Sequence, residues 1–203
     1  AGRNDNAVAV GDAGIAGQMF AAQGFSAPIV LWQPTEDMVT DEALKTVLRY
    51  WNKVRGGQRV PMREDIEIGD LGPVQDSLML LDRVEGWDWR YRHYGQAIAD
   101  LAQVDHTGMR TSEVRAGNFI AYFFLASYAA VGQRRHPLYT VHSPPAESTA
   151  TVWRRMILPV SDDRGEIVPM QGGKLPGPYR EIVGELYVRW RAPPRATTVA
   201  ASS

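Results

Sequence analysis

Hydrophobic and polar positions alternate strictly along residues 89–94. Trp89, Tyr91 and His93 take the odd positions, and two arginines and a tyrosine take the even ones. Successive side chains of a β-strand point to opposite faces, so the pattern predicts a half-buried strand with one aromatic face. An apolar run over residues 77–85 precedes it, and the Glu-Gly-Trp-Asp corner between them predicts an antiparallel hairpin. An isolated hairpin is barely stable, so its aromatic face requires a cover.

The predicted cover is the longest apolar stretch of the chain, residues 119–131. Asn118 is a suitable N-cap for a helix there, and Pro137 prevents its continuation. With 13 residues the stretch is shorter than the ~20 that a membrane span requires. We therefore expect a buried helix that packs on the hairpin.

A second, amphipathic helix is predicted over residues 40–54. Thr40 is a suitable N-cap, and the Gly56-Gly57 pair ends the helical pattern. Apolar side chains recur at helical spacing on one stripe of this helix, which consists of Leu44, Val47, Leu48 and Trp51. The stripe predicts that the helix packs on a sheet or on a partner chain.

After the long helix the pattern returns to strands. Residues 138–143 and 148–160 are predicted strands, a further strand begins at residue 166, and residues 174–191 are ambiguous between strand and helix. Strands on both sides of a helical block predict an α+β fold with an antiparallel sheet that helices cover on one face.

The two ends of the chain differ from the middle. Residues 1–33 lack sustained periodicity and are predicted to be disordered or loosely packed, and the Ala/Pro/Ser tail over residues 192–203 is predicted to be disordered. Residues 34–191 would then form a single domain. The first thirty residues lack the basic start and the apolar core of a secretion signal, which favours the cytoplasm, and a leader that has been removed stays an open alternative.

Composition narrows the classes of function. The chain of 203 residues carries 22 basic and 23 acidic residues, for a net charge of −1. This balance argues against nucleic acid or an anionic membrane as a partner, because such partners select basic patches. There is no cysteine. Disulfides, thiolate zinc sites, thiol nucleophiles and cysteine-dependent flavin photochemistry are therefore excluded.

Three motifs point to a family. They are the hairpin strand that ends in Gly95, the Thr107-Gly108 pair after a short predicted helix, and residues 155–163 with Leu158-Pro159. With these motifs, residues 44–172 resemble the PAS-like domains that occur as small stand-alone bacterial proteins. The resemblance implies a five-stranded antiparallel sheet cupped by short helices and one longer helix.

The same resemblance implies a sensory or regulatory role in signal transduction by protein–protein contact. Some relatives bind a small ligand between sheet and helices, and others bind nothing. We expect a homodimer that uses the amphipathic stripe, or contact with another signalling protein. The alternative is a small-molecule-binding enzyme, a hydrolase or an isomerase, on an α+β fold. Because no catalytic motif is found, we do not expect an enzyme.

A ligand between the long helix and the inner sheet face would meet aromatic walls and polar tips. The candidate ligand-binding residues are Trp89, Tyr91, His93, Tyr122, Arg154 and Met156. Arg154 discriminates between the alternatives. It shares a strand face with Met156, and a guanidinium that faces the core must be paired or must bind an anionic or carbonyl group. An exposed strand edge, or a bulge that re-aims the side chain, is the favoured alternative.

The four histidines do not indicate a cofactor. For His93 a hydrogen-bonded core or edge histidine is favoured over a ligand or a pH sensor. His136 ends the long helix near the place of a haem ligand in haem-binding PAS domains, but a histidine that complements the helix dipole is favoured. No metal-ligand spacing is present, so no metal site and no cofactor are predicted.

Overall fold

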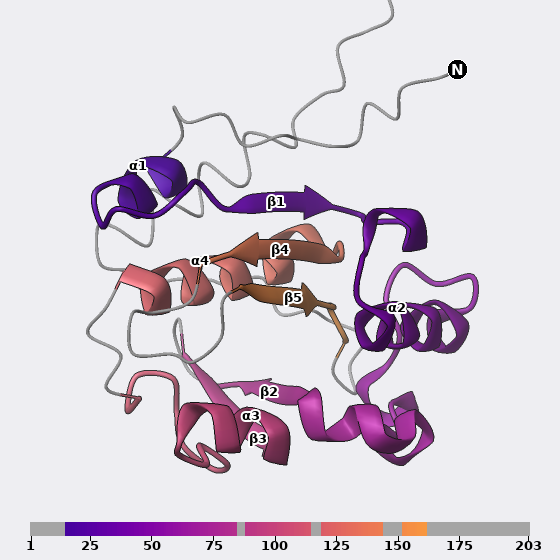
Figure 1. The fold of residues 1–203 in the computed structure, drawn as a ribbon. Helices are drawn as coiled ribbons and strands as arrows, with labels where there is room; N and C mark the ends of the chain where they lie inside the picture. Colours follow the sequence, from indigo (N-terminus) through magenta and orange to yellow (C-terminus); the bar gives the residue numbers. More distant parts are fainter. Residues whose placement is uncertain (1–14, 85–87, 115–118, 144–151, 162–203) are drawn as a thin grey trace, which may run out of the picture.

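The computed structural model describes residues 15–84, 88–114, 119–143 and 152–161 (Figure 1). The fold combines α-helices with antiparallel β-sheets. In chain order the elements are α1 (Ile15–Ala21), β1 (Ile29–Trp32), the short helix η1 (Glu36–Met38), α2 (Glu42–Arg55), the short helices η2 (Arg63–Asp65) and η3 (Ile68–Ser77), β2 (Met79–Arg83), β3 (Trp89–Tyr94), α3 (Gln96–Ala102), α4 (Phe119–Arg134), β4 (Leu138–His142) and β5 (Trp153–Ile157).

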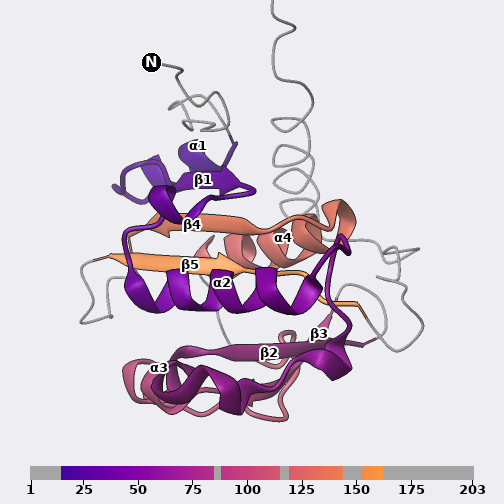
Figure 2. The same cartoon turned by 90° about the vertical axis from the view of Figure 1, so that its right-hand side faces the viewer.

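The strands form two sheets rather than one. The first has the order β1-β4-β5, and the second is the β2-β3 hairpin that the alternating pattern predicted. β5 lies on the side of its sheet that faces β2 (Figures 1 and 2). A single five-stranded sheet is therefore not formed by the described residues. The strand expected from residue 166 lies outside them.

Helices cover both faces of the three-stranded sheet (Figure 2). Leu138 and Ile157 pack with α4 and α1 on one face, while Tyr139 and Met156 pack with α2 on the other. This corrects the expectation of helices on one face only. Each strand carries large apolar side chains at odd and at even positions, and a strand of that kind needs a cover on both sides.

The segment before residue 34 is more ordered than its composition indicates. β1 pairs with β4 at four positions, from Ile29↔Val141 to Trp32↔Leu138. Phe20 of α1 is buried and meets Phe123 edge to face, with 5.4 Å between ring centroids. The prediction of a disordered or loosely packed leader is therefore wrong for residues 15–33. Residues 1–14 and the tail at 192–203 lie outside the described residues.

The amphipathic helix is present, but its apolar stripe faces its own chain. Asp41, not Thr40, is the N-cap, because its side chain accepts a hydrogen bond of 3.1 Å from the backbone N–H of Leu44. Leu44 is half-buried, and the other three stripe residues, Val47, Leu48 and Trp51, are buried. Trp51 also donates a hydrogen bond of 2.8 Å from Nε1 to the Pro159 carbonyl. This stripe is consequently not free to form the expected dimer interface, while the oligomeric state itself stays a prediction.

Gly95 joins the hairpin to α3 at a point where no side chain fits. A Cβ atom there would lie 2.3 Å from the Asp76 carbonyl oxygen, which belongs to the backbone and cannot rotate away. We expect Gly95→Ala to lower the free energy of unfolding by about 1–3 kcal/mol, as overpacking does. Gly57→Ala is the matched control, since a Cβ there would meet nothing within 4 Å. Urea unfolding of the two variants measures the difference, and equal losses would contradict the close approach.

Candidate functional site

One face of β4 and β5 carries unusual polar residues beneath α4. The register pairs Thr140 with Arg155 and His142 with Trp153. Directly opposed residues of an antiparallel pair share a face, and these two pairs share theirs with Leu138 and Ile157, which pack against α4. Arg155, Thr140 and His142 therefore lie together on the α4 side of the sheet.

Arg155 is half-buried, and one of its guanidinium nitrogens has no hydrogen-bond partner among the described residues. This nitrogen, Nη1, is itself buried. Its Cζ atom lies 3.6 Å from the ring centroid of Phe124 and 5.3 Å from that of Tyr128, so both rings of α4 stabilise the cation. No ion pair between described residues includes Arg155. Two aromatic rings thus stabilise the positive charge of Arg155, and its Nη1 atom is left without a hydrogen-bond acceptor among these residues.

Two further polar atoms on this face are also unpaired. The Oγ1 atom of Thr140 and the Nε2 atom of His142 are buried without a hydrogen-bond partner within the described ranges. The two residues are 0% and 3% exposed. Burying a polar group unpaired costs about 1–3 kcal/mol, and native proteins contain few such groups. Three of them on one face indicate a place for a polar molecule.

A hydrogen bond to a backbone carbonyl decides which ring nitrogen of His142 carries the proton. Its Nδ1 atom lies 2.8 Å from the Ser143 carbonyl oxygen, which can only accept a hydrogen bond, so Nδ1 carries the proton. Burial above all, with a smaller effect of the Arg155 charge, lowers the pKa of His142 to about 4. Rings of Phe20, Phe123, Phe124 and Trp153 surround it. At neutral pH, Nε2 is therefore an unprotonated acceptor inside an aromatic cage.

A cluster of tyrosines extends the site toward the hairpin. Burial first, and then the hydroxyl groups of Tyr128 and Tyr94, raise the pKa of Tyr91, and the positive charge of Arg155 opposes this. Burial raises the pKa of Tyr94 to about 12. The ring of Tyr91 stacks on His106 at 5.9 Å between centroids. These phenols stay protonated at neutral pH and can donate hydrogen bonds to a bound anion.

The structure separates the residues that the sequence grouped as a ligand site. Trp89 and Tyr91 are buried on the predicted face, and Trp89 contacts Tyr128 of α4 at 5.8 Å between centroids. His93 makes a hydrogen bond of 3.1 Å between Nε2 and the Gln75 carbonyl. This agrees with the favoured interpretation of His93 as a hydrogen-bonded core or edge histidine. Tyr122 lies on α4, but its side chain is outside the described part of the structure.

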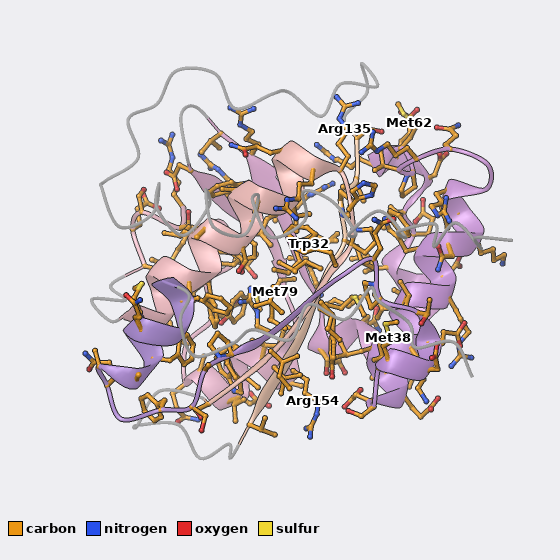
Figure 3. All side chains as sticks on the ribbon, turned by 90° about the horizontal axis from the view of Figure 1, so that it is seen from above. Trp32, Met38, Met62, Met79, Arg135 and Arg154 are labelled. Atoms are coloured by element: carbon orange, nitrogen blue, oxygen red, sulfur yellow. The ribbon has the colours of Figure 1, made fainter. Side chains whose placement is uncertain are left out.

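The other two candidates lie on the wrong side of the sheet. Met156 packs in the cluster beneath α2. Arg154 is exposed and points away from the body of the molecule (Figure 3). This exposure agrees with the favoured alternative of an exposed strand edge, and the neighbouring Arg155 lies on the face beneath α4 instead. Alternation placed the two arginines on opposite faces correctly, but the apolar residues around Arg154 face α2 rather than α4.

The groove between α2 and the end of α4 is a separate feature. It encloses about 470 Å³, and Trp51, Arg55, Arg59 and His136 are among the residues that line it. Arg59 donates from Nη2 to the Arg134 carbonyl at 2.9 Å and to Nε2 of His136 at 3.1 Å. Burial, Arg59 and Arg134 lower the pKa of His136. These contacts close the C-terminal end of α4, so we assign them a structural role.

His142 and His136 do not belong to a metal-binding group formed by the described residues. Within the described ranges, no three His, Cys, Asp or Glu residues gather closely enough to hold a metal ion. The same ranges include no helix with the length and hydropathy needed to cross a membrane.

A family model described as PAS domain matches residues 39–173. The chain belongs to the PAS domain family. No curated protein and no solved structure matched the chain. The match includes α2, the hairpin, α3, α4, β4 and β5, and thus every residue of the site beneath α4 except Phe20. Membership of the PAS family indicates a sensory or regulatory role in general.

Proposed function

We propose that this PAS domain is a sensor in signal transduction that responds to a small anionic molecule bound between α4 and the three-stranded sheet. The observation that carries the proposal is the buried, unpaired Nη1 atom of Arg155. The domain would act on a second copy of itself or on another signalling protein in the cytoplasm. Oligomeric state and location are parts of the proposal.

The chemistry of Arg155 selects the class of ligand. A guanidinium cannot lose its proton in a protein, so its buried N–H donors need an anion or a carbonyl group, while aromatic faces can stabilise its charge without accepting those donors. Phe124 and Tyr128 supply the aromatic faces. A carboxylate or a phosphate would pair with the remaining donor and offset the desolvation of the charge. The nearby Tyr91 is suited to donate a second hydrogen bond to the same anion.

The alternative of a hydrolase or an isomerase has less support. General base catalysis is most effective when the pKa of the base lies near the working pH. His142 has a pKa of about 4 and is a weak base at pH 7. The pKa of Tyr91 is raised, so its phenolate is not available as a nucleophile. These groups suit binding better than proton transfer, and we propose that the domain is not an enzyme.

Adjacent arginines provide a matched test of the proposal. Small carboxylic acids and inorganic phosphate should be screened for a rise in melting temperature, since a ligand at 100 times its dissociation constant stabilises the native state by about 2.7 kcal/mol. We expect at least one acid to stabilise the wild type by several degrees. Arg155→Met should abolish this shift, and Arg154→Met, which changes an exposed arginine on the opposite face of the same strand, should retain it.

The two variants also separate specific binding from general charge effects. An equal loss of the shift in both variants would indicate non-specific attraction of the anion to positive charge. A wild type that no acid stabilises would contradict the proposal.

A further inference from the structure

Besides the negative charge that Arg155 selects, His142 places a second requirement on the chemistry of the ligand. Its Nδ1 proton is used by the Ser143 carbonyl at 2.8 Å, which leaves Nε2 as an acceptor. Nε2 has no donor within reach among the described residues. A carboxylate cannot satisfy it, because a carboxylate offers only lone pairs to a lone pair. Only a group that donates a hydrogen bond complements this atom.

Arg155 and His142 are placed to contact one molecule at two points. The ring of Phe124 lies against both, at 3.6 Å from Arg155 Cζ and at 5.4 Å from the His142 ring. Thr140 stands opposite Arg155, and His142 follows two residues later on the same face. The unpaired hydroxyl of Thr140 lies on the same face and can donate or accept.

We infer that the ligand is a small acid that also carries a hydroxyl or amino group at its far end. The acid pairs with Arg155, and the hydroxyl or amino group donates to Nε2 of His142. This inference rests on the proposed function and names its ligand class. The aromatic cage around His142 excludes water from that hydrogen bond, which makes an unsatisfied Nε2 costly and a matched donor selective.

Matched pairs of acids test the inference. Benzoate and 4-hydroxybenzoate differ only in a hydroxyl at the far end of a ring, and pentanoate and 5-hydroxypentanoate differ in the same way on a flexible chain. Isothermal titration of the wild type should show about tenfold tighter binding of the hydroxy acid in at least one pair, the usual worth of one buried hydrogen bond. This comparison requires no variant and is independent of any effect on folding.

The His142→Phe variant locates the effect. Phenylalanine keeps a ring inside the aromatic cage but has no acceptor, so the variant should bind both members of a pair as tightly as the wild type binds the plain acid. Circular dichroism should confirm that the variant is folded. Thr140→Val provides a second variant of nearly the same shape, and we expect it to weaken both members of each pair equally.

The outcomes separate the inference from the proposed function. If plain and hydroxy acids bind the wild type equally and Arg155→Met abolishes both, the inference fails and the proposed function stands. If no acid binds, or if binding is indifferent to Arg155→Met, the proposed function fails and the inference fails with it. A preference for the hydroxy acid that survives in His142→Phe would also overturn the role assigned to His142.

Discussion

The Phe123→Ala variant is expected to lose about 3–5 kcal/mol of unfolding free energy. Phe123 is 1% exposed and lies at the centre of the core beneath α4. It contacts Phe20 and His142 edge to face, at 5.4 Å between ring centroids in both cases. These neighbours come from α1 and β4, which are fixed by other contacts and cannot close around the space that the ring leaves. The cost therefore includes a cavity in addition to the lost apolar burial.

Leu101→Ala is the control for this measurement. Leu101 lies on α3 and is 43% exposed, so its truncation should cost less than about 0.5–1 kcal/mol. Both variants should be compared with the wild type by urea unfolding at neutral pH. If Phe123→Ala loses less than about 1 kcal/mol, α4 is not the core helix that its sequence and packing indicate.

The second large effect is a loss of stability in acid that depends on His142. The pKa of this histidine is about 4 in the folded chain and 6.5 in the unfolded chain. Between these values the unfolded state binds more protons, so stability rises with pH. The contribution is complete above about pH 6.5 and is lost as the pH falls toward 4. At pH 5 the wild type should have lost about 2 kcal/mol through this group, relative to pH 7.5.

The His142→Phe variant isolates this contribution, since other groups titrate over the same range. Unfolding free energies of the wild type and the variant should be measured at pH 7.5, 6 and 5. We expect the difference between the two proteins to change by about 2 kcal/mol in favour of the variant as the pH falls. Parallel pH dependence of the two proteins would mean that His142 is hydrated or already charged in the folded state.

The strongest periodic patterns were sufficient to predict the central elements. The hairpin around Trp89 and Tyr91, the long helix α4 and the amphipathic helix α2 all lie where alternation or helical spacing predicted them. The contact between Trp89 and Tyr128 confirms that α4 covers the aromatic face. β1 was missed because four residues are too few for a periodic pattern, and its partner β4 lies more than a hundred residues away.

The candidate site was predicted less well, for a reason that applies to any doubly covered sheet. In β5, Trp153 and Ile157 lie on one face and Met156 lies on the other, where Leu158, just after the strand, joins the same cluster. Alternation separates the two faces but does not say which one α4 covers. The choice of Arg154 over Arg155 therefore depended on information that only the tertiary structure supplies. The amphipathic pattern of α2 was ambiguous in the same way, because it does not distinguish the chain's own sheet from a partner.

The pairing of β1 with β4 means that the folding unit of this protein is larger than the family boundary. The family match begins at residue 39, after β1 has ended at Trp32. A chain trimmed to that boundary would expose the side of β4 that β1 now pairs with, and such bare strand edges recruit other chains. It would also lose the Trp32 ring, which lies 4.1 Å from the Arg134 guanidinium at the end of α4. For this PAS domain, truncation at the family limits would therefore favour aggregation over an independent module.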